Sequence, residues 1–143
     1  MRGFEVATSG WMDAMAGAVA AEMDPATLAE PFSLVEIFRN LPHHIEPNGD
    51  ATFAWYVCVS AAGVDVGPGS LPDPDLRILM THAVAVKLGR LAYEDAASLA
   101  MRDDIYALAA SDGSVTFEGD AKLPPLFAAA LLRAHNRMAP QTL

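Results

Sequence analysis

The chain has 143 residues, which predicts a single domain, residues 1–143, with a sizeable core. A domain of this size does not need disulfides for stability, and the single cysteine could not form one within the chain. Its net charge of −9 has the wrong sign for nucleic acid or anionic lipid surfaces and argues against both as partners. Hydrophobic residues make up 52% of the sequence, yet no apolar run approaches the roughly eighteen residues that span a bilayer, so we expect a cytoplasmic protein without membrane insertion.

The first predicted element is a helix over residues 10–23, in which Trp11, Met15 and Val19 share one face. Proline after Asp24 ends this helix. The next segment, FSLVEIFRNLP at residues 32–42, is predicted to be a second helix, because Ser33 and Glu36 have the spacing of a capping box.

A turn at HHIEPNGD, residues 43–50, then introduces three predicted strands. They are ATFAWYVCVS at residues 51–60, GVDVGPG at residues 63–69 and DLRILMT at residues 75–81. All are rich in aromatic or β-branched residues, and the short connection at Ala62 and Gly63 predicts an antiparallel hairpin between the first two.

The C-terminal half returns to helices at residues 82–91 and 93–110, followed by a turn, a strand and a final helix. In the strand, Val115, Phe117 and Gly119 alternate with polar residues. The final helix begins at Pro124 and Pro125 and is apolar almost all round. This order predicts an α+β fold with an antiparallel or mixed sheet and helices on one face.

No catalytic or metal-binding motif stands out. The four histidines lack metal-ligand spacing, and neither a G-x-S-x-G motif nor a phosphate-binding loop occurs, so we expect no metal and no cofactor. Glu118 and Asp120 share one face of the last strand and could share a proton, although a solvated face explains them more simply. Arg133, His135 and Arg137 could hold a carboxylate, but a cationic helix end is the simpler interpretation.

Three stretches resemble the sterol carrier protein-2 (SCP-2) family of lipid-binding domains. They are the hairpin FAWYVCVSAAGVDVGPGSL, the following PDPDLRIL, and ASDGSVTFEGD before an apolar helix. In that family a G-x-h-x-h-x-G-D strand, with h an apolar residue, precedes the last helix. The residues that match it here are Gly113, Val115, Phe117, Gly119 and Asp120.

The resemblance implies a five-stranded sheet flanked by helices that encloses an apolar tunnel for a fatty acyl, sterol or similar ligand. It covers residues 32–143, and residues 1–31 would form an extra N-terminal helical extension that fills the tunnel or makes a dimer contact. The last helix would close the tunnel, with Phe127, Ala130 and Leu131 facing the sheet and Ala128 or Leu132 facing a ligand or neighbour. The candidate cavity residues are Phe53, Trp55, Leu99, Tyr106, Phe117, Phe127 and Leu131.

These patterns lead to three functional hypotheses. The first is a non-enzymatic carrier that binds a hydrophobic small molecule by burial. The second is a homodimerising module whose core is filled. The third is a small cofactor-free enzyme that uses Asp120 or Glu118 as a general base beside an apolar pocket.

Overall fold

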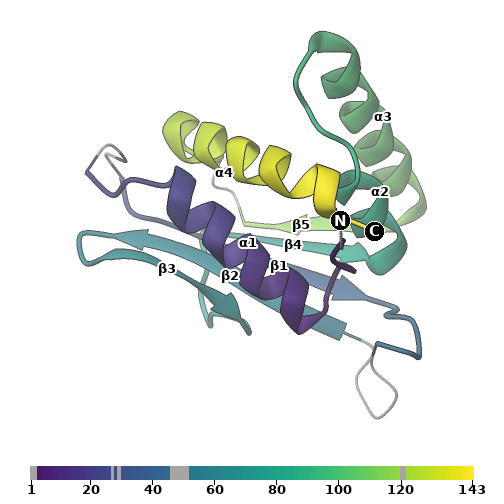
Figure 1. The fold of residues 1–143 in the computed structure, drawn as a ribbon, viewed down its shortest axis with the longest axis horizontal. Coiled ribbons are helices and arrows are strands. Elements are labelled where there is room, and N and C mark those ends of the chain that lie inside the picture. The colour runs from purple at the N-terminus through teal and green to yellow at the C-terminus, as the bar shows by residue number, and fades with distance from the viewer. Residues whose placement is uncertain (1–2, 27, 29, 46–51, 120–121) are drawn as a thin grey trace.

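A computed structural model describes residues 3–26, 28, 30–45, 52–119 and 122–143. One mixed sheet carries helices α1 and α4 side by side over one face, which we call the inner face (Figure 1). The strands are β1 (Phe32–Arg39), β2 (Thr52–Ser60), β3 (Gly63–Pro68), β4 (Leu76–Thr81) and β5 (Val115–Glu118). The helices are α1 (Ser9–Glu22), α2 (His82–Gly89), α3 (Ala96–Asp112), α4 (Pro125–Met138) and the 3-10 turn η1 (Ala139–Gln141).

The sheet order is β3-β2-β1-β4-β5. Strands β2 and β3 form the predicted antiparallel hairpin, β2 also pairs antiparallel with β1, and β5 pairs antiparallel with β4. The central pair, β1 and β4, is parallel. The predicted α+β fold with a mixed five-stranded sheet flanked by helices is therefore confirmed, as is a helix before the first strand.

The prediction of a helix over residues 32–42 is wrong, because the first eight of these residues form the central strand β1. Ser33 does not cap a helix: its backbone N–H donates to the Asp75 carboxylate at 2.8 Å, and its hydroxyl accepts from the Asp75 N–H at 2.9 Å. Leu34 is buried on the inner face and Val35 on the opposite one. A strand that is apolar on both faces lacks strict alternation and resembles a helix in sequence.

Helix α1 packs its predicted apolar face onto the sheet. The Trp11 ring meets the rings of Phe38, Phe53 and Trp55 edge-on, with centroids 5.8–6.1 Å apart. Such edge-to-face contacts suit aromatic rings and add to the stabilisation from burial. The helix is therefore part of the core that covers β1 and β2.

The basic residues that the sequence groups at the end of α4 have separate roles. Arg133 and Arg137 both pair with Glu22 at the end of α1, which joins the two helices of the layer. His135 instead lies partly buried on the side of α4 that faces β1 and α3. The three residues therefore do not form one cationic site.

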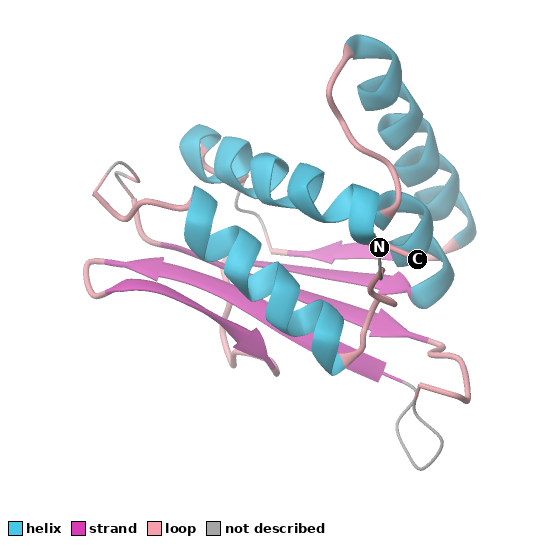
Figure 2. Cartoon of the chain, viewed as in Figure 1, coloured by secondary structure: helices cyan, strands magenta, loops and turns pink. Residues whose placement is uncertain are grey.

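Helix α3 is the least anchored of the helices. It begins at Ala96 rather than at the predicted Tyr93, because Asp95 and Ser98 form a capping box there, and it ends at Asp112 with Gly113 as its C-cap. Ala109 is its only fully buried residue. Figure 2 shows α3 projecting away from the layer of α1 and α4, with the loop that leads to it beside α4. Within the described residues, no helix is long and apolar enough to cross a membrane.

Candidate functional site

A large cavity of about 490 Å³ lies between the inner face of the sheet and helices α3 and α4. Small-molecule sites typically occupy about 300–1,000 Å³, so this cavity is large enough for a ligand. Its wall is mostly apolar, with a few polar side chains. The lining residues are Met15, Leu34, Glu36, Trp55, Leu76, Ile78, Tyr93, Arg102, Asp103, Tyr106, Phe117, Leu123, Ala128, Leu131, Leu132 and His135.

The floor of the cavity is a row of side chains that crosses four strands. Strand register places Trp55 beside Glu36, Glu36 beside Ile78, and Ile78 beside Phe117. A carboxyl group thus stands in the middle of an aromatic and aliphatic row. Residues two apart on β1 lie on the same face, so Leu34 and Phe38 flank Glu36 along the strand.

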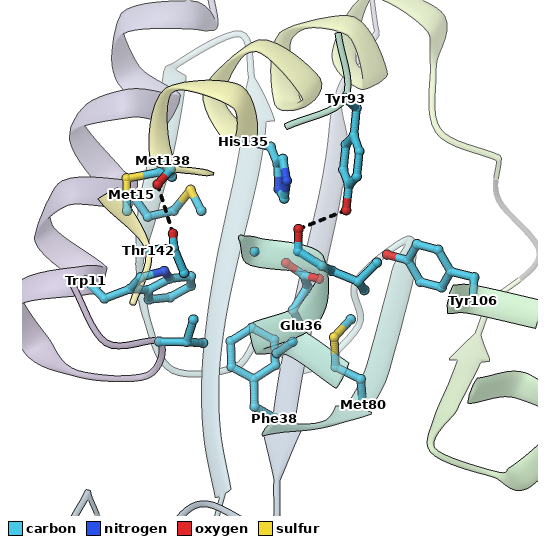
Figure 3. Close-up of a pocket in the computed structure, with 14 residues that line it drawn as sticks. Trp11, Met15, Glu36, Phe38, Met80, Tyr93, Tyr106, His135, Met138 and Thr142 are labelled. Carbon is cyan, nitrogen blue, oxygen red and sulfur yellow. Dashed lines mark hydrogen bonds between the residues drawn. The ribbon is translucent and has the colours of Figure 1, made fainter. Parts of the chain in front are cut away.

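A smaller cavity of about 100 Å³ adjoins the first and is drawn in Figure 3. The two share part of their lining, namely Met15, Glu36, Tyr93, Tyr106 and His135. Glu36 therefore stands where the two spaces meet. The figure shows the hydroxyl groups of Tyr93 and Tyr106 directed toward the region of its carboxylate.

Burial raises the pKa of Glu36 from 4.5 to about 7. Desolvation has this effect because the low-dielectric surroundings disfavour the charged form. In the part of the chain that the structure describes, no arginine, lysine or histidine pairs with this carboxylate. The group is therefore close to half ionised near neutral pH.

The indole of Trp55 lies beside Glu36 with an unused donor. Its Nε1–H is buried and has no hydrogen-bond partner among the described residues. It is close enough to the Glu36 carboxylate to lower the pKa of that group, but it lies outside hydrogen-bond geometry. Buried polar groups without a partner are rare, and each requires an explanation.

Tyr93 is held firmly at the wall of the cavity. Its hydroxyl donates to the Leu88 carbonyl at 2.9 Å, and its backbone N–H donates to the side chain of Asn136 at 2.8 Å. Its ring stacks on His135 with centroids 4.4 Å apart. Burial raises the pKa of Tyr93 to about 12 and also raises that of Tyr106, and the nearby Glu36 adds to both shifts.

Positive charge is scarce around the cavity. Burial lowers the pKa of His135, whose Nε2 lies 2.8 Å from the Leu91 carbonyl, so this ring is neutral at pH 7. Among the described lining residues, Arg102 is then the one cation. It pairs with Asp103 at 3.3 Å and lies over the Tyr93 ring.

The structure brings together some of the residues that the sequence nominated. Trp55, Tyr106, Phe117 and Leu131 line the large cavity, and so do Ala128 and Leu132 on α4. Three nominated residues lie outside it. Phe127 packs against Phe32, Phe53 packs against Trp11, and Leu99 lies on α3 outside the lining.

Sequence reasoning missed Glu36, because the residue was assigned to a helix cap. The signal was present in the alternation of Phe32, Leu34, Glu36 and Phe38, which puts one carboxylate on the apolar side of a strand. Of the acidic pair that was considered instead, Glu118 is exposed and pairs with Arg77 at 3.4 Å. Asp120 lies outside the described residues.

The backbone arrangement matches known structures at low sequence identity. A crystal structure of sterol carrier protein 2 aligns over 94% of this chain and 99% of its own, at 16% identity and a TM-score of 0.53. The chain has the SCP-2 fold. The sterol carrier protein domain 2 of Helicoverpa armigera aligns over 92% of this chain and 87% of its own, at 14% identity and a TM-score of 0.52.

The solution structure of a conserved hypothetical protein of Thermus thermophilus aligns over 97% of this chain and 93% of its own, at 18% identity and a TM-score of 0.53. These alignments extend beyond residues 32–143, so the shared fold includes sequence before Phe32. No protein-family model and no curated protein matches the sequence.

Proposed function

We propose that the protein binds and carries an apolar small molecule in the large cavity. The observation that carries this proposal is a space of about 490 Å³ with a largely aliphatic and aromatic wall. The SCP-2 fold supports it, since two of the matching structures bear the name of sterol carrier proteins.

The composition of α4 also supports a bound ligand. Phe127, Ala130 and Ala134 on this helix are buried in the protein core. Ala128 and Leu132 are only partly buried and line the cavity. A ligand in the cavity would therefore cover this second apolar side of the helix.

Such a cavity is suited to reversible binding. At about −0.3 kcal/mol per heavy atom, a ligand of roughly twenty to twenty-five atoms would bind with about −6 to −8 kcal/mol. This free energy corresponds to a dissociation constant in the micromolar range. A carrier needs that balance, because it has to release what it binds.

Native mass spectrometry of the purified protein, followed by solvent extraction, tests the proposal. We expect a co-purifying apolar compound in near-stoichiometric amount. The variant Leu132→Trp, which places a larger side chain in the cavity, should lose that mass. Leu126→Trp is the matched control, because Leu126 lies on the same helix but is 55% exposed and does not line the cavity. Equal ligand loading in both variants would contradict the proposed site.

The homodimer stays a prediction. Its most suitable surface is the outward face of α3, where Met101 and Leu108 are both more than half exposed and lie two helical turns apart. The same native spectra distinguish this alternative, since a dimer without any ligand would favour an interaction module over a carrier.

A further inference from the structure

One end of the large cavity is polar, and it combines acceptors with two donors that have no partner among the described residues, the Tyr106 hydroxyl and the Trp55 Nε1–H. We call this the Glu36 end; it comprises Glu36, Trp55, Tyr93 and Tyr106. The Tyr93 hydroxyl hydrogen is committed to the Leu88 carbonyl, which leaves the oxygen as an acceptor. The Tyr106 hydroxyl makes no hydrogen bond to any described residue. An ionised Glu36 can accept about four hydrogen bonds.

The Glu36 end also lacks a compensating positive charge. No cation in the described part of the chain pairs with Glu36, and Arg102 is already engaged by Asp103 and the face of Tyr93. A buried charge is normally paired or hydrogen-bonded, because its desolvation is costly. A cation from outside the chain would supply such a partner to the ionised carboxylate, whereas the protonated carboxyl group needs none.

Aromatic side chains surround the same point. Trp55 is 2% exposed and Tyr93 is 6% exposed, and both line the cavity next to Glu36 together with Tyr106. Aromatic faces attract cations, particularly where water is excluded. The position of Arg102 over the Tyr93 ring, 5.4 Å from the centroid, is an example within this protein.

We propose that the cavity selects an apolar molecule carrying a protonated amine, whose ammonium group pairs with Glu36. This inference rests on the proposed carrier function and names the chemistry of the ligand. An ammonium group supplies three hydrogen-bond donors and the missing charge. The Glu36 carboxylate has enough lone pairs to accept several of these donors.

Other head groups fit the Glu36 end less well. A ligand carboxylate would place two acidic groups together, so that one of them has to remain protonated. An alcohol offers a single donor and no charge. The binding preference should therefore run from amine to alcohol to carboxylate.

Three probes with one ten-carbon chain test this order: decylamine, decan-1-ol and decanoate. Their dissociation constants are measured by titration calorimetry with the wild-type protein near pH 8, where Glu36 is ionised. We expect decylamine to bind about tenfold or more tightly than decan-1-ol, as for a charge-assisted hydrogen bond, and decanoate to bind most weakly. Equal affinity for amine and alcohol would overturn the amine preference and leave the carrier function intact. Failure of all three probes to bind would overturn both.

The variant Glu36→Gln assigns the preference to this side chain. We expect it to bind decylamine no better than decan-1-ol. Glu30→Gln removes the same charge from an exposed position outside the large cavity and should keep the wild-type preference. An unchanged preference in folded Glu36→Gln would overturn the assignment. If that variant does not fold, the probe series on the wild-type protein still decides the question.

The preference should also depend on pH. Near pH 5.5 Glu36 is mostly protonated, so the advantage of decylamine over decan-1-ol should shrink about tenfold. The alkyl ammonium itself stays charged across this range. The other titratable groups around the cavity are Tyr93, Arg102, Asp103, Tyr106 and His135. A preference that stays constant between the two pH values in the wild-type protein would count against Glu36 as the partner.

Discussion

At the scale of single residues, Glu36 should make the protein less stable as the pH rises. Its pKa in the folded state is about 7, against 4.5 for a free side chain, so between these values the folded state holds a proton that the unfolded state has lost. The stabilising contribution is complete below pH 4.5 and is lost as the pH rises through 7. The difference amounts to about 3 kcal/mol of unfolding free energy.

Urea unfolding of the wild-type protein and of Glu36→Gln between pH 4.5 and 8 measures this contribution. As the pH rises, the unfolding free energy of the wild-type protein should fall relative to that of Glu36→Gln. His135 acts in the opposite direction, since its lowered pKa costs stability as the pH falls, but it is present in both proteins and cancels in the comparison. Parallel pH profiles would show that Glu36 titrates normally.

The sequence allowed part of this site to be predicted. Trp55 and Leu131, which line the cavity, were nominated because aromatic and aliphatic residues on a strand or helix face have a local signature. Tyr93 and His135 were not nominated. Their contact joins a loop to a helix forty-two positions later in the chain, and no local sequence pattern indicates such a contact. Glu36 was missed because a charge within an apolar run was interpreted as a cap rather than as a side chain facing the core.

At the scale of elements, the end of β5 tolerates no side chain. Gly119 has φ +113°, and a Cβ atom there would overlap the Asp75 carbonyl oxygen on the neighbouring chain segment. Gly113, at the end of α3, also has a positive φ of +81°, but open space surrounds it. Substitutions at the two glycines therefore distinguish two costs: a side chain at Gly113 adds backbone strain alone, and one at Gly119 adds backbone strain and steric overlap.

We expect Gly113→Ala to cost about 1 kcal/mol, from backbone strain alone. Gly119→Ala should cost roughly 2 kcal/mol more, because the β4–β5 edge has to move. Denaturant midpoints of the two variants compare these costs directly. Equal midpoints would mean that the backbone at Asp75 moves aside without a measurable cost in stability.

Most elements followed from local patterns, and the exception is informative. The hairpin of β2 and β3 was predicted from alternating apolar residues around a short glycine-containing turn, and the structure confirms it. Strand β1 was not predicted as a strand. It lies in the middle of the sheet, between β2 and β4. Its environment depends on segments far along the chain, so its own residues fit two structures equally well.

At the scale of the whole molecule, ligand binding and folding are linked. A probe that binds only the folded state at ten times its dissociation constant adds about 1.4 kcal/mol to the unfolding free energy. For a chain of this size that corresponds to a rise in Tm of about 4 °C. We expect decylamine to produce this rise in the wild-type protein and in Leu126→Trp, but not in Leu132→Trp. Thermal unfolding with and without the probe measures it, and an equal rise in all three would place the probe elsewhere.

The weak anchoring of α3 has a consequence for the rate of exchange. The sheet and α4 form the floor and one wall of the cavity, and both are continuous with the core. Helix α3 contributes Arg102 and Tyr106 to the opposite wall, but Ala109 is its only fully buried residue. Outward movement of α3 would break the contacts of Ala109, Ile105 and Tyr106 with the core but leave the layer of α1 and α4 intact, so we expect it to need less free energy than unfolding. For a ligand bound in the cavity, we therefore expect the residence time to depend on α3 and the affinity to depend mainly on the floor. Mutations on the outward face of this helix should change how fast a ligand comes and goes without changing which ligand is chosen.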